Sequence, residues 1–507
     1  MNRRRFLATA LALGASNPLP VWGAPKYPAN PFSLGVASGD PLPDGAVLWT
    51  RLAPKPLKGG GMPEMNVPVD WMVSEDESMR RIVRRGTAMA TPALAHSVHV
   101  EVGGLAPGRW YWYQFRTGSE ISPIGRFRTA PALGADVEAI RFAFASCQSY
   151  TYGYYTAYQH MSEENLDFVL HLGDYIYEKS YAGKTRQHLV PEVFTLAEYR
   201  NQYALYKSDP LLQKAHAAFP FITTWDDHEV SNNYADFRHE RDMPKEEFLK
   251  RREAAYQAYY EHLPLRRASL PSGPNMRLYR RLDFGRLLRL HVLDTRQYRT
   301  DQPCGDGQKP ACDEVRVPGQ TMLGSAQEKW LENGLMNSKA LWNALGQQVM
   351  FTHQDFDPGD GERYNMDSWS GYHLARERVV EVLSRKPSLN PVILTGDVHS
   401  NWVGEVRTDI RNPESWCVAT EFVGTSISSG GDGVDMRPGL EKVLSHNPQI
   451  RFFNGQRGYV RCEVTKKHWR ADYRIVERVT EPGAPIRTRA SFAVEVGNPI
   501  PQVVSNS

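Results

Sequence analysis

The sequence predicts an α/β protein in two modules: a β-sandwich, followed by a larger layered domain in which β-sheets are flanked by helices. Short alternating apolar runs fill residues 31–131. Apolar strands alternate with helical stretches over residues 139–507. A chain of 507 residues is also long enough for two or more domains. Together these patterns indicate a sandwich joined to a layered α/β domain.

The first module contains the runs "AVLWTRL", "VDWMVS", "HSVHVEV" and "WYWYQFRT", which alternate apolar and polar residues. Turn signals such as Pro43-Asp44-Gly45 separate them. Short strands with this spacing are typical of a β-sandwich. The segment "GLAPGRWYWYQFRTG", with "GRFRTAP" after it, resembles the closing strands of a fibronectin type III-like domain. We expect its aromatic side chains to form core.

The second module opens with the apolar strand "IRFAFASC", and further buried strands include "LDFVLHLGD", "FPFITTWDDHE" and "PVILTGDVHSN". Helical stretches such as "EEFLKRREAAYQAYYEHL" lie between several of them. The alternation predicts a layered α/β fold. The end of the chain, residues 487–507, reads as extended, with two prolines, and no covering helix is predicted there.

Residues 1–24 indicate a targeting segment. Arg3, Arg4 and Arg5 precede a short apolar stretch from Leu7 to Ala15, which is shorter than the roughly 20 residues that span a bilayer. The string resembles a twin-arginine export signal, which implies the twin-arginine machinery as a partner and a periplasmic or secreted location. A free N-terminal helix is the alternative.

Charge and hydropathy give no support for two classes of partner. The net charge is only +3, from 60 basic and 57 acidic residues, so there is no nucleic-acid-binding signal. No internal segment has transmembrane length and apolarity, and we expect no stable membrane anchor in the mature chain.

Five cysteines are present. Cys304 and Cys312 lie in a loop rich in Gly, Pro and Asp, and in an oxidising compartment they could pair. An odd count leaves at least one free thiol, and Cys147 is the one expected to stay free.

Metal-competent side chains follow the ends of several apolar strands. The segments are "FASCQS", "HLGDYIYE", "TWDDHEVSNN", "MFTHQDFD" and "LTGDVHSNW". Each alone has an ordinary explanation: Gly-Asp is often a turn, a buried His is often core, and Asp226-Asp227-His228 could cap a helix. The carboxyl ends of strands in open α/β sheets meet at a ligand crevice, however. Thiol, carboxylate and imidazole converging there would be costly to bury unless cations compensate them.

The order of these segments resembles the calcineurin-like metallophosphoesterase superfamily and, more closely, the PhoD-like alkaline phosphatases, which are related to purple acid phosphatases. The resemblance rests on "ASGDP", "FASCQ", "LGDYIYE", "WDDHEVSNNYA", "AYQAYYEHLPLR", "LDTRQYR", "TGDVHSNW" and "EFVGTSISS". It covers nearly all of the chain after the signal segment.

The resemblance implies six metal ligands: Cys147, Asp174, Tyr177, Asp227, Asp397 and His399. Asp174 would bridge two metals. Thiolate and phenolate favour Fe³⁺ at one site, and the oxygen-rich second site favours a hard cation such as Ca²⁺. Two metal sites are therefore expected.

Further residues are expected to act on a phosphate-ester substrate. Arg266 matches a phosphate-binding arginine of the family, although a surface role is the alternative. His228 is expected to protonate or stabilise the leaving oxygen, with Asp226 orienting its ring. Asn232 and Asn233 are expected to bind either calcium or phosphate, and Glu229 to support the site from behind.

The predicted function is an exported metal-dependent phosphoesterase that hydrolyses phosphate monoesters, diesters or both. A phospholipase D-like or nucleotide-directed phosphodiesterase is the alternative with the same chemistry. A secreted binding protein without catalysis is a third reading, and it predicts lost metal ligands.

Overall fold

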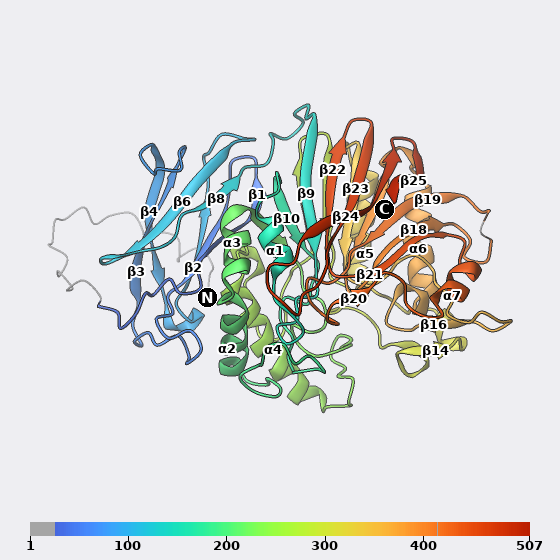
Figure 1. Ribbon diagram of the computed structural model, residues 1–507, viewed down its shortest axis with the longest axis horizontal. Coiled ribbons are helices and arrows are strands. Elements are labelled where there is room, and N and C mark those ends of the chain that lie inside the picture. Colours follow the sequence, from blue (N-terminus) through green and yellow to red (C-terminus); the bar gives the residue numbers. More distant parts are fainter. Residues whose placement is uncertain (1–25, 413, 507) are drawn as a thin grey trace, which may run out of the picture.

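The computed structural model describes residues 26–412 and 414–506, so the predicted signal segment 1–24 lies outside the described residues. Two large sheets face each other, helices cover their outer sides, and a smaller β-rich module lies at one end (Figure 1). The layered α/β fold predicted from the sequence is confirmed. No helix in ranges 26–412 and 414–506 has the length and apolarity needed to cross a membrane.

The first sheet has ten strands. In spatial order they are β25 (Asn498–Asn506), β24 (Ile486–Glu495), β23 (His468–Val476), β22 (Gly458–Thr465), β9 (Ala139–Ala145), β10 (Phe168–His171), β11 (Pro220–Thr223), β1 (Val36–Leu42), β2 (Gly45–Arg51) and β5 (Ser97–Val102). The run β9, β10, β11 and β1 is parallel. β10 and β11 are buried throughout, as expected of parallel strands covered on both faces.

The second sheet has eight strands. Their order is β12 (Arg280–Phe284), β13 (Leu288–Val292), β15 (Trp342–Gln347), β17 (Pro391–Thr395), β19 (Cys417–Val423), β18 (Asn401–Arg407), β21 (Ile450–Gln456) and β20 (Gly433–Val434). Strands β13, β15, β17 and β19 run parallel. Both sheets therefore contain a parallel centre with antiparallel flanks.

The main core lies between the two sheets, where Phe142 and Leu170 of the first sheet belong to one buried cluster with Leu290 and Val392 of the second. The outer helices are α1 (Thr156–Met161), α2 (Leu196–Lys207), α3 (Pro210–Ala218) and α4 (Lys245–His262) beside the first sheet, and α5 (Gly324–Met336) and α6 (His373–Ser384) beside the second. A short helix, α7 (Leu440–His446), lies at the far edge (Figure 1). The layers are thus helix, sheet, sheet and helix.

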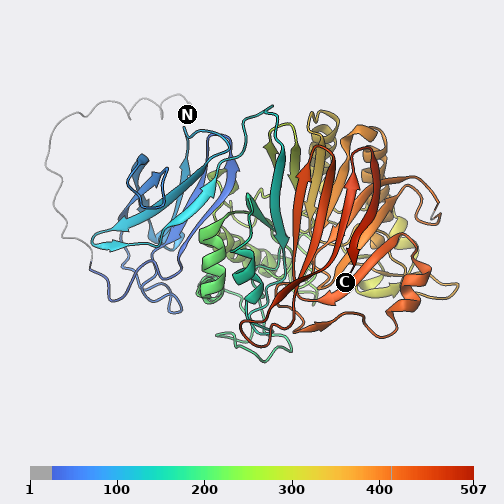
Figure 2. The same ribbon diagram turned by 45° about the horizontal axis from the view of Figure 1, so that its top comes forward.

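The N-terminal module is an antiparallel β-sandwich that shares a sheet with the larger domain. Its outer sheet consists of β3 (Val67–Ser74), β4 (Ile82–Ala90), β6 (Trp110–Thr117), β7 (Glu120–Ile121) and β8 (Gly125–Arg128). A common core joins it to β1, β2 and β5. Because β1 pairs with β11, with Gly39 opposite Phe221, the module extends the ten-stranded sheet rather than standing apart (Figure 2). This pairing covers an edge of β11 that would otherwise be open.

The chain end is extended and Cys304 is bridged to Cys312, as the sequence indicated. The last described residues form β24 and β25, which pair as antiparallel strands. Cys304 and Cys312 form a disulfide, and Cys147, Cys417 and Cys462 are free and buried.

Candidate metal centre

Polar residues gather at the carboxyl ends of four central strands, two or more residues beyond each strand in most cases. Cys147 follows β9, Asp174 follows β10, Asp227 follows β11 and Asp397 follows β17. The first three strands belong to one sheet and β17 to the other. Because parallel strands end at the same edge, the two facing sheets deliver these side chains to one place.

One group of side chains surrounds Asp174. The ligand atoms of Cys147, Asp174 and His399 all lie within 4.8 Å of one another. The Tyr177 hydroxyl lies 2.9 Å from Asp174 Oδ2 and 3.1 Å from His399 Nε2. These four residues, predicted from separate segments, therefore form one cluster of sulfur, oxygen and nitrogen ligands.

A second group is made of carboxylates. One oxygen each of Asp226, Asp227 and Asp397 lies within 4.8 Å of the others, and Asp174, Asp227 and His228 form an overlapping group. Asp174 and Asp227 thus connect the two groups. The six predicted ligands therefore converge on one place.

The electrostatics of the pocket fit bound cations. Asp174 Oδ1, Asp226 Oδ2 and Asp227 Oδ1 are buried and have no hydrogen-bond partner among the residues that the structure describes. Burial raises the pKa of Asp174 and of Asp397 well above the usual range. Burial, and then the charge of Asp174, also raises the pKa of the Cys147 thiol. Buried anionic ligands in this number need cations nearby, and metals bind their deprotonated forms.

Backbone conformation marks the same residues. Positive φ angles occur at Cys147 (58°), Asp174 (57°), Asp397 (62°) and His399 (51°). A non-glycine residue in this region costs about 1–3 kcal/mol, and such residues cluster at functional sites. Gly173, with φ of 109°, is required because a Cβ there would lie 2.5 Å from the Cβ of Asp226.

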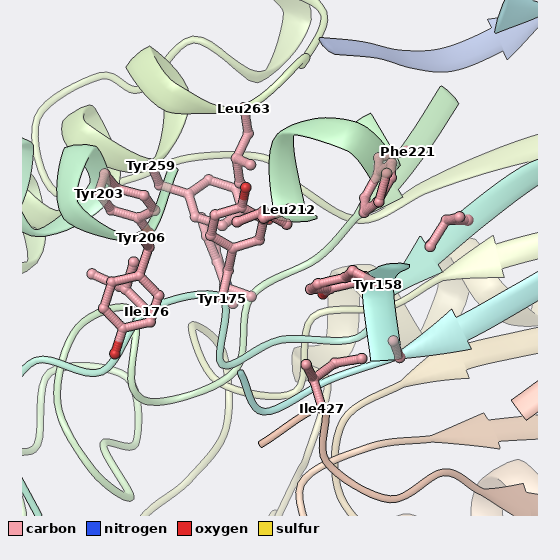
Figure 3. Close-up of a cluster of buried hydrophobic side chains, with 14 of the residues drawn as sticks. Tyr158, Tyr175, Ile176, Tyr203, Tyr206, Leu212, Phe221, Tyr259, Leu263 and Ile427 are labelled. Carbon is pink, nitrogen blue, oxygen red and sulfur yellow. The ribbon is translucent and has the colours of Figure 1, made fainter. Parts of the chain in front are cut away.

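The segment that carries Asp174 and Tyr177 is anchored by the two residues between them. Tyr175 and Ile176 are fully buried in the cluster beneath the site, together with Tyr158, Leu212 and Tyr259 (Figure 3). Burying a large apolar side chain contributes about 1.5–3 kcal/mol. Packing therefore holds the loop in the conformation that aims both ligands into the pocket.

His228 is held by Glu178, not by Asp226. Its Nδ1 lies 2.8 Å from Glu178 Oε2, and its ring stacks on Tyr177 with centroids 4.1 Å apart. Burial lowers the pKa of His228, but Asp227, Asp174 and Glu178 raise it further, so the net shift is upward. Asp226 instead accepts a hydrogen bond from Arg296 Nε at 2.5 Å. The prediction that Asp226 orients His228 is corrected, because Glu178 occupies that position.

Arg266 is not brought to the cluster. Its guanidinium donates to Glu101 Oε2 at 3.0 Å and to the carbonyl of Asp40 at 2.7 Å, both in the N-terminal module. None of its contacts within the described ranges is with a metal-competent side chain of the pocket. The predicted substrate contact is corrected: here Arg266 joins the sandwich to the end of helix α4.

The two asparagines differ in position. Asn233 N–H donates to Asp227 Oδ2 at 2.7 Å, so Asn233 lies at the edge of the pocket. The Asn232 amide donates to Glu240 Oε2 at 2.6 Å, on the exposed side. Only Asn233 is therefore in direct contact with a candidate ligand.

Two buried residues support the site from behind, of which only Glu229 was expected from the sequence. Glu229, expected to support the site, accepts hydrogen bonds from the backbone N–H groups of Asp174, Tyr175 and Asp226. Arg296 was missed: its buried guanidinium also makes two bonds of 2.8 Å to Asp367. The motif "LDTRQYR" was the signal that pointed to Arg296, but nothing in it indicates which carboxylates the arginine binds.

Arg296 is expected to be essential for stability. Arg296→Met leaves Asp226 buried without its cation and Asp367 with Arg299 alone, and breaking such a buried pair costs about 3–5 kcal/mol of unfolding free energy. Urea unfolding of both proteins measures the difference. Arg385→Met is the control, because its ion pair with Glu332 is exposed and is expected to contribute about 0–1 kcal/mol. A loss for Arg296→Met no larger than for the control would contradict the assignment.

The two-sheet fold and its pocket of thiol, phenol, imidazole and carboxylates define a metal-dependent phosphoesterase. The sequence model of the PhoD-like phosphatase family matches residues 142–473, and that of the PhoD-like phosphatase N-terminal domain matches residues 18–131. The chain belongs to the PhoD-like phosphatase family.

Two known proteins illustrate the similarity. The chain is 53% identical over 510 residues to alkaline phosphatase D of Bacillus subtilis (strain 168), a match that covers 97% of this chain and 88% of that protein. A solved structure described as "Structure of PhoD" superposes with a TM-score of 0.94 at 54% identity, covering 96% of this chain and 94% of the other. This chain is accordingly a phosphoesterase.

Proposed function

We propose that this chain is an exported alkaline phosphatase of the D type that hydrolyses phosphate monoesters, diesters or both in a pocket holding iron and calcium. The observation that carries the proposal is the convergence of Cys147, Asp174, Tyr177 and His399 on one side and Asp227 and Asp397 on the other. Among the described residues, three buried carboxylate oxygens of this pocket lack partners, which fits a cluster of cations.

The donor set suggests which cation each side would hold. Thiolate and phenolate ligands from Cys147 and Tyr177 suit Fe³⁺, and the neutral imidazole of His399 can complete the set, since burial and then Arg457 lower its pKa. Carboxylates from Asp227 and Asp397 suit Ca²⁺, and Asp174 would supply a carboxylate ligand to either cation. When bound, the cations would supply positive charge that neutralises phosphate oxygens and activates water.

Other residues of the chain would move protons and fix geometry. Protonated His228 would donate a proton to the leaving oxygen, while Glu178 holds the ring through Nδ1 and leaves Nε2 for that transfer. Glu229 accepts hydrogen bonds from the N–H groups of Asp174 and Asp226, and it would thereby hold these two backbone segments together. Arg296 would balance the charge of Asp226 and Asp227 behind the metals.

Export is part of the proposal. The twin-arginine-like string in residues 1–24 supports translocation of the folded protein to the periplasm or exterior. The Cys304–Cys312 disulfide supports an oxidising compartment. A phospholipase D-like or nucleotide-directed diesterase is the alternative with the same pocket.

Metal-loaded protein is expected to hydrolyse p-nitrophenyl phosphate at neutral to alkaline pH, because the pocket offers cations to the phosphate and a proton donor to the leaving group. A calcium-selective chelator is expected to abolish this hydrolysis, and added calcium to restore it. Rates on the monoester, bis-p-nitrophenyl phosphate, a phospholipid and a cyclic nucleotide identify the substrate class. No hydrolysis of any of these by fully loaded protein would contradict the proposal.

The visible spectrum tests the iron assignment separately. Phenolate and thiolate bound to Fe³⁺ give charge-transfer absorption, so Tyr177→Phe should remove or shift the band while the chain stays folded. Tyr181→Phe is the matched control, because Tyr181 lies beside Tyr177 but is not a proposed ligand. A colourless active enzyme that contains only zinc and ignores the chelator would overturn the iron–calcium assignment and leave the phosphoesterase proposal standing.

A further inference from the structure

A loop closed by the Cys304–Cys312 disulfide lies next to the pocket. Its strand β14 (Gln308–Pro310) pairs with β16 (Arg363–Asn365), and Gly307 accepts a hydrogen bond from the backbone N–H of Met366 at 2.9 Å. The disulfide spans a sequence separation of 8 residues. Asp306 lies inside this closed segment, with its backbone at φ of 61°.

The disulfide-closed loop contacts the pocket through Asn233. Asp306 Oδ2 accepts a hydrogen bond from Asn233 Nδ2 at 2.7 Å. Gln302, just before this loop, donates from Nε2 to the Asn233 carbonyl at 2.7 Å and to Asp367 Oδ1 at 2.7 Å. Because Asn233 N–H donates to Asp227 Oδ2, two hydrogen bonds connect the loop to a candidate metal ligand.

The hydrogen bond between the Asp306 carboxylate and the Asn233 carboxamide fixes the direction of the Asn233 amide. An ionised carboxylate only accepts hydrogen bonds, whereas a carboxamide has one end that donates and one that accepts. The NH₂ group of Asn233 must therefore face Asp306, and its Oδ1 is turned to the opposite side. Asn233 also has a positive φ of 49°, so the surrounding contacts hold both its backbone and its side chain.

We infer that Asp306 is a positioning residue: the disulfide-closed loop holds its carboxylate where it turns the Asn233 oxygen away from the loop, as an acceptor for the cation beside Asp227. This inference rests on the proposed function and deepens it. It assigns Asn233 to cation binding rather than to donation toward the phosphate. It also gives the exposed disulfide a role at the site, since loss of the bridge frees the segment that carries Asp306.

Asp306→Ala is expected to weaken calcium binding about 10- to 100-fold, the usual effect of removing a group that orients a metal ligand. The measurement is isothermal titration of calcium into iron-loaded protein, together with kcat and KM for p-nitrophenyl phosphate at saturating calcium. We expect Asn233→Ala to have a similar effect and the double variant to add little, because both changes remove the same oriented oxygen.

Two variants separate positioning from general stability. Asp306→Asn can accept the same bond but also allows the flipped amide, so its calcium affinity should lie between those of wild type and Asp306→Ala. Asp313→Ala, an exposed carboxylate on the other side of the disulfide, should bind calcium like wild type. Thermal unfolding of each variant checks that the chain is folded.

The bridge is tested with Cys304→Ser/Cys312→Ser and with wild type reduced by a phosphine. Both should bind calcium more weakly than the oxidised protein, and the phosphine should leave the serine variant unchanged. Wild-type affinity in either sample would overturn the role given to the disulfide.

Wild-type calcium affinity in a folded Asp306→Ala protein would overturn the inference. The proposed function would still stand if the wild-type protein hydrolyses the ester. A wild-type protein that neither binds calcium nor hydrolyses the ester would instead contradict the proposed function.

Discussion

Asp174→Ala is expected to abolish phosphoester hydrolysis. Asp174 belongs to the group with Cys147 and His399 and also to the overlapping group with Asp227 and His228, so it lies between the two proposed cations and its loss removes an anionic ligand from the site. Metal ions supply several kcal/mol of charge stabilisation in such reactions. At about 1.4 kcal/mol per tenfold change, this corresponds to a fall in kcat/KM of about 10³-fold or more. The measurements are p-nitrophenyl phosphate hydrolysis and metal content after equilibration with iron and calcium.

The matched control for Asp174→Ala is Asp360→Ala. Asp360 is an exposed carboxylate on the loop before β16, and we expect its replacement to leave rate and metal content unchanged. A folded Asp174→Ala protein with close to the wild-type rate would show that hydrolysis occurs elsewhere. Loss of both metals with retained hydrolysis would separate the activity from the metal centre.

His228→Ala is expected to impair hydrolysis in a way that depends on the leaving group. General acid catalysis contributes about 10²- to 10⁴-fold, mostly for a poor alkoxide leaving group that needs a proton. We therefore expect a large loss with a simple alkyl phosphate and a much smaller one with p-nitrophenyl phosphate, whose phenolate leaves readily. The comparison of kcat for the two esters measures this effect. His446→Ala, an exposed histidine on α7, is the control.

The pH profile provides a second readout for His228. Asp227, Asp174 and Glu178 raise the pKa of His228, so its protonated form persists to higher pH and is lost as pH rises through that pKa. Glu178→Gln removes one of these charges, and the alkaline limb for the alkyl ester should move to lower pH. Equal losses on both esters, with an unmoved alkaline limb, would exclude His228 as the leaving-group acid.

Much of the pocket could be predicted because it depends on local patterns. Cys147, Asp174, Asp227 and Asp397 each follow an apolar strand, and parallel strands end at the same edge of a sheet. Their convergence therefore follows from strand direction alone. The alternation of apolar and polar residues in 31–131 likewise indicated the sandwich. A strand that buries one face places every second side chain in the core. The family resemblance added the expected partners of these residues, such as Tyr177 and His399, from motif order.

The sequence by itself determined the layered α/β class, the sandwich and the set of metal-competent residues, because strand periodicity and strand-end motifs are local properties. Only the tertiary structure decided which distant groups meet. It paired His228 with Glu178 and Arg266 with Glu101, and it placed Arg296 between Asp226 and Asp367. These contacts depend on how loops and helices pack over the strand ends, and local pattern does not specify that packing. Burial then makes each pairing matter, because a charge removed from water needs a partner nearby.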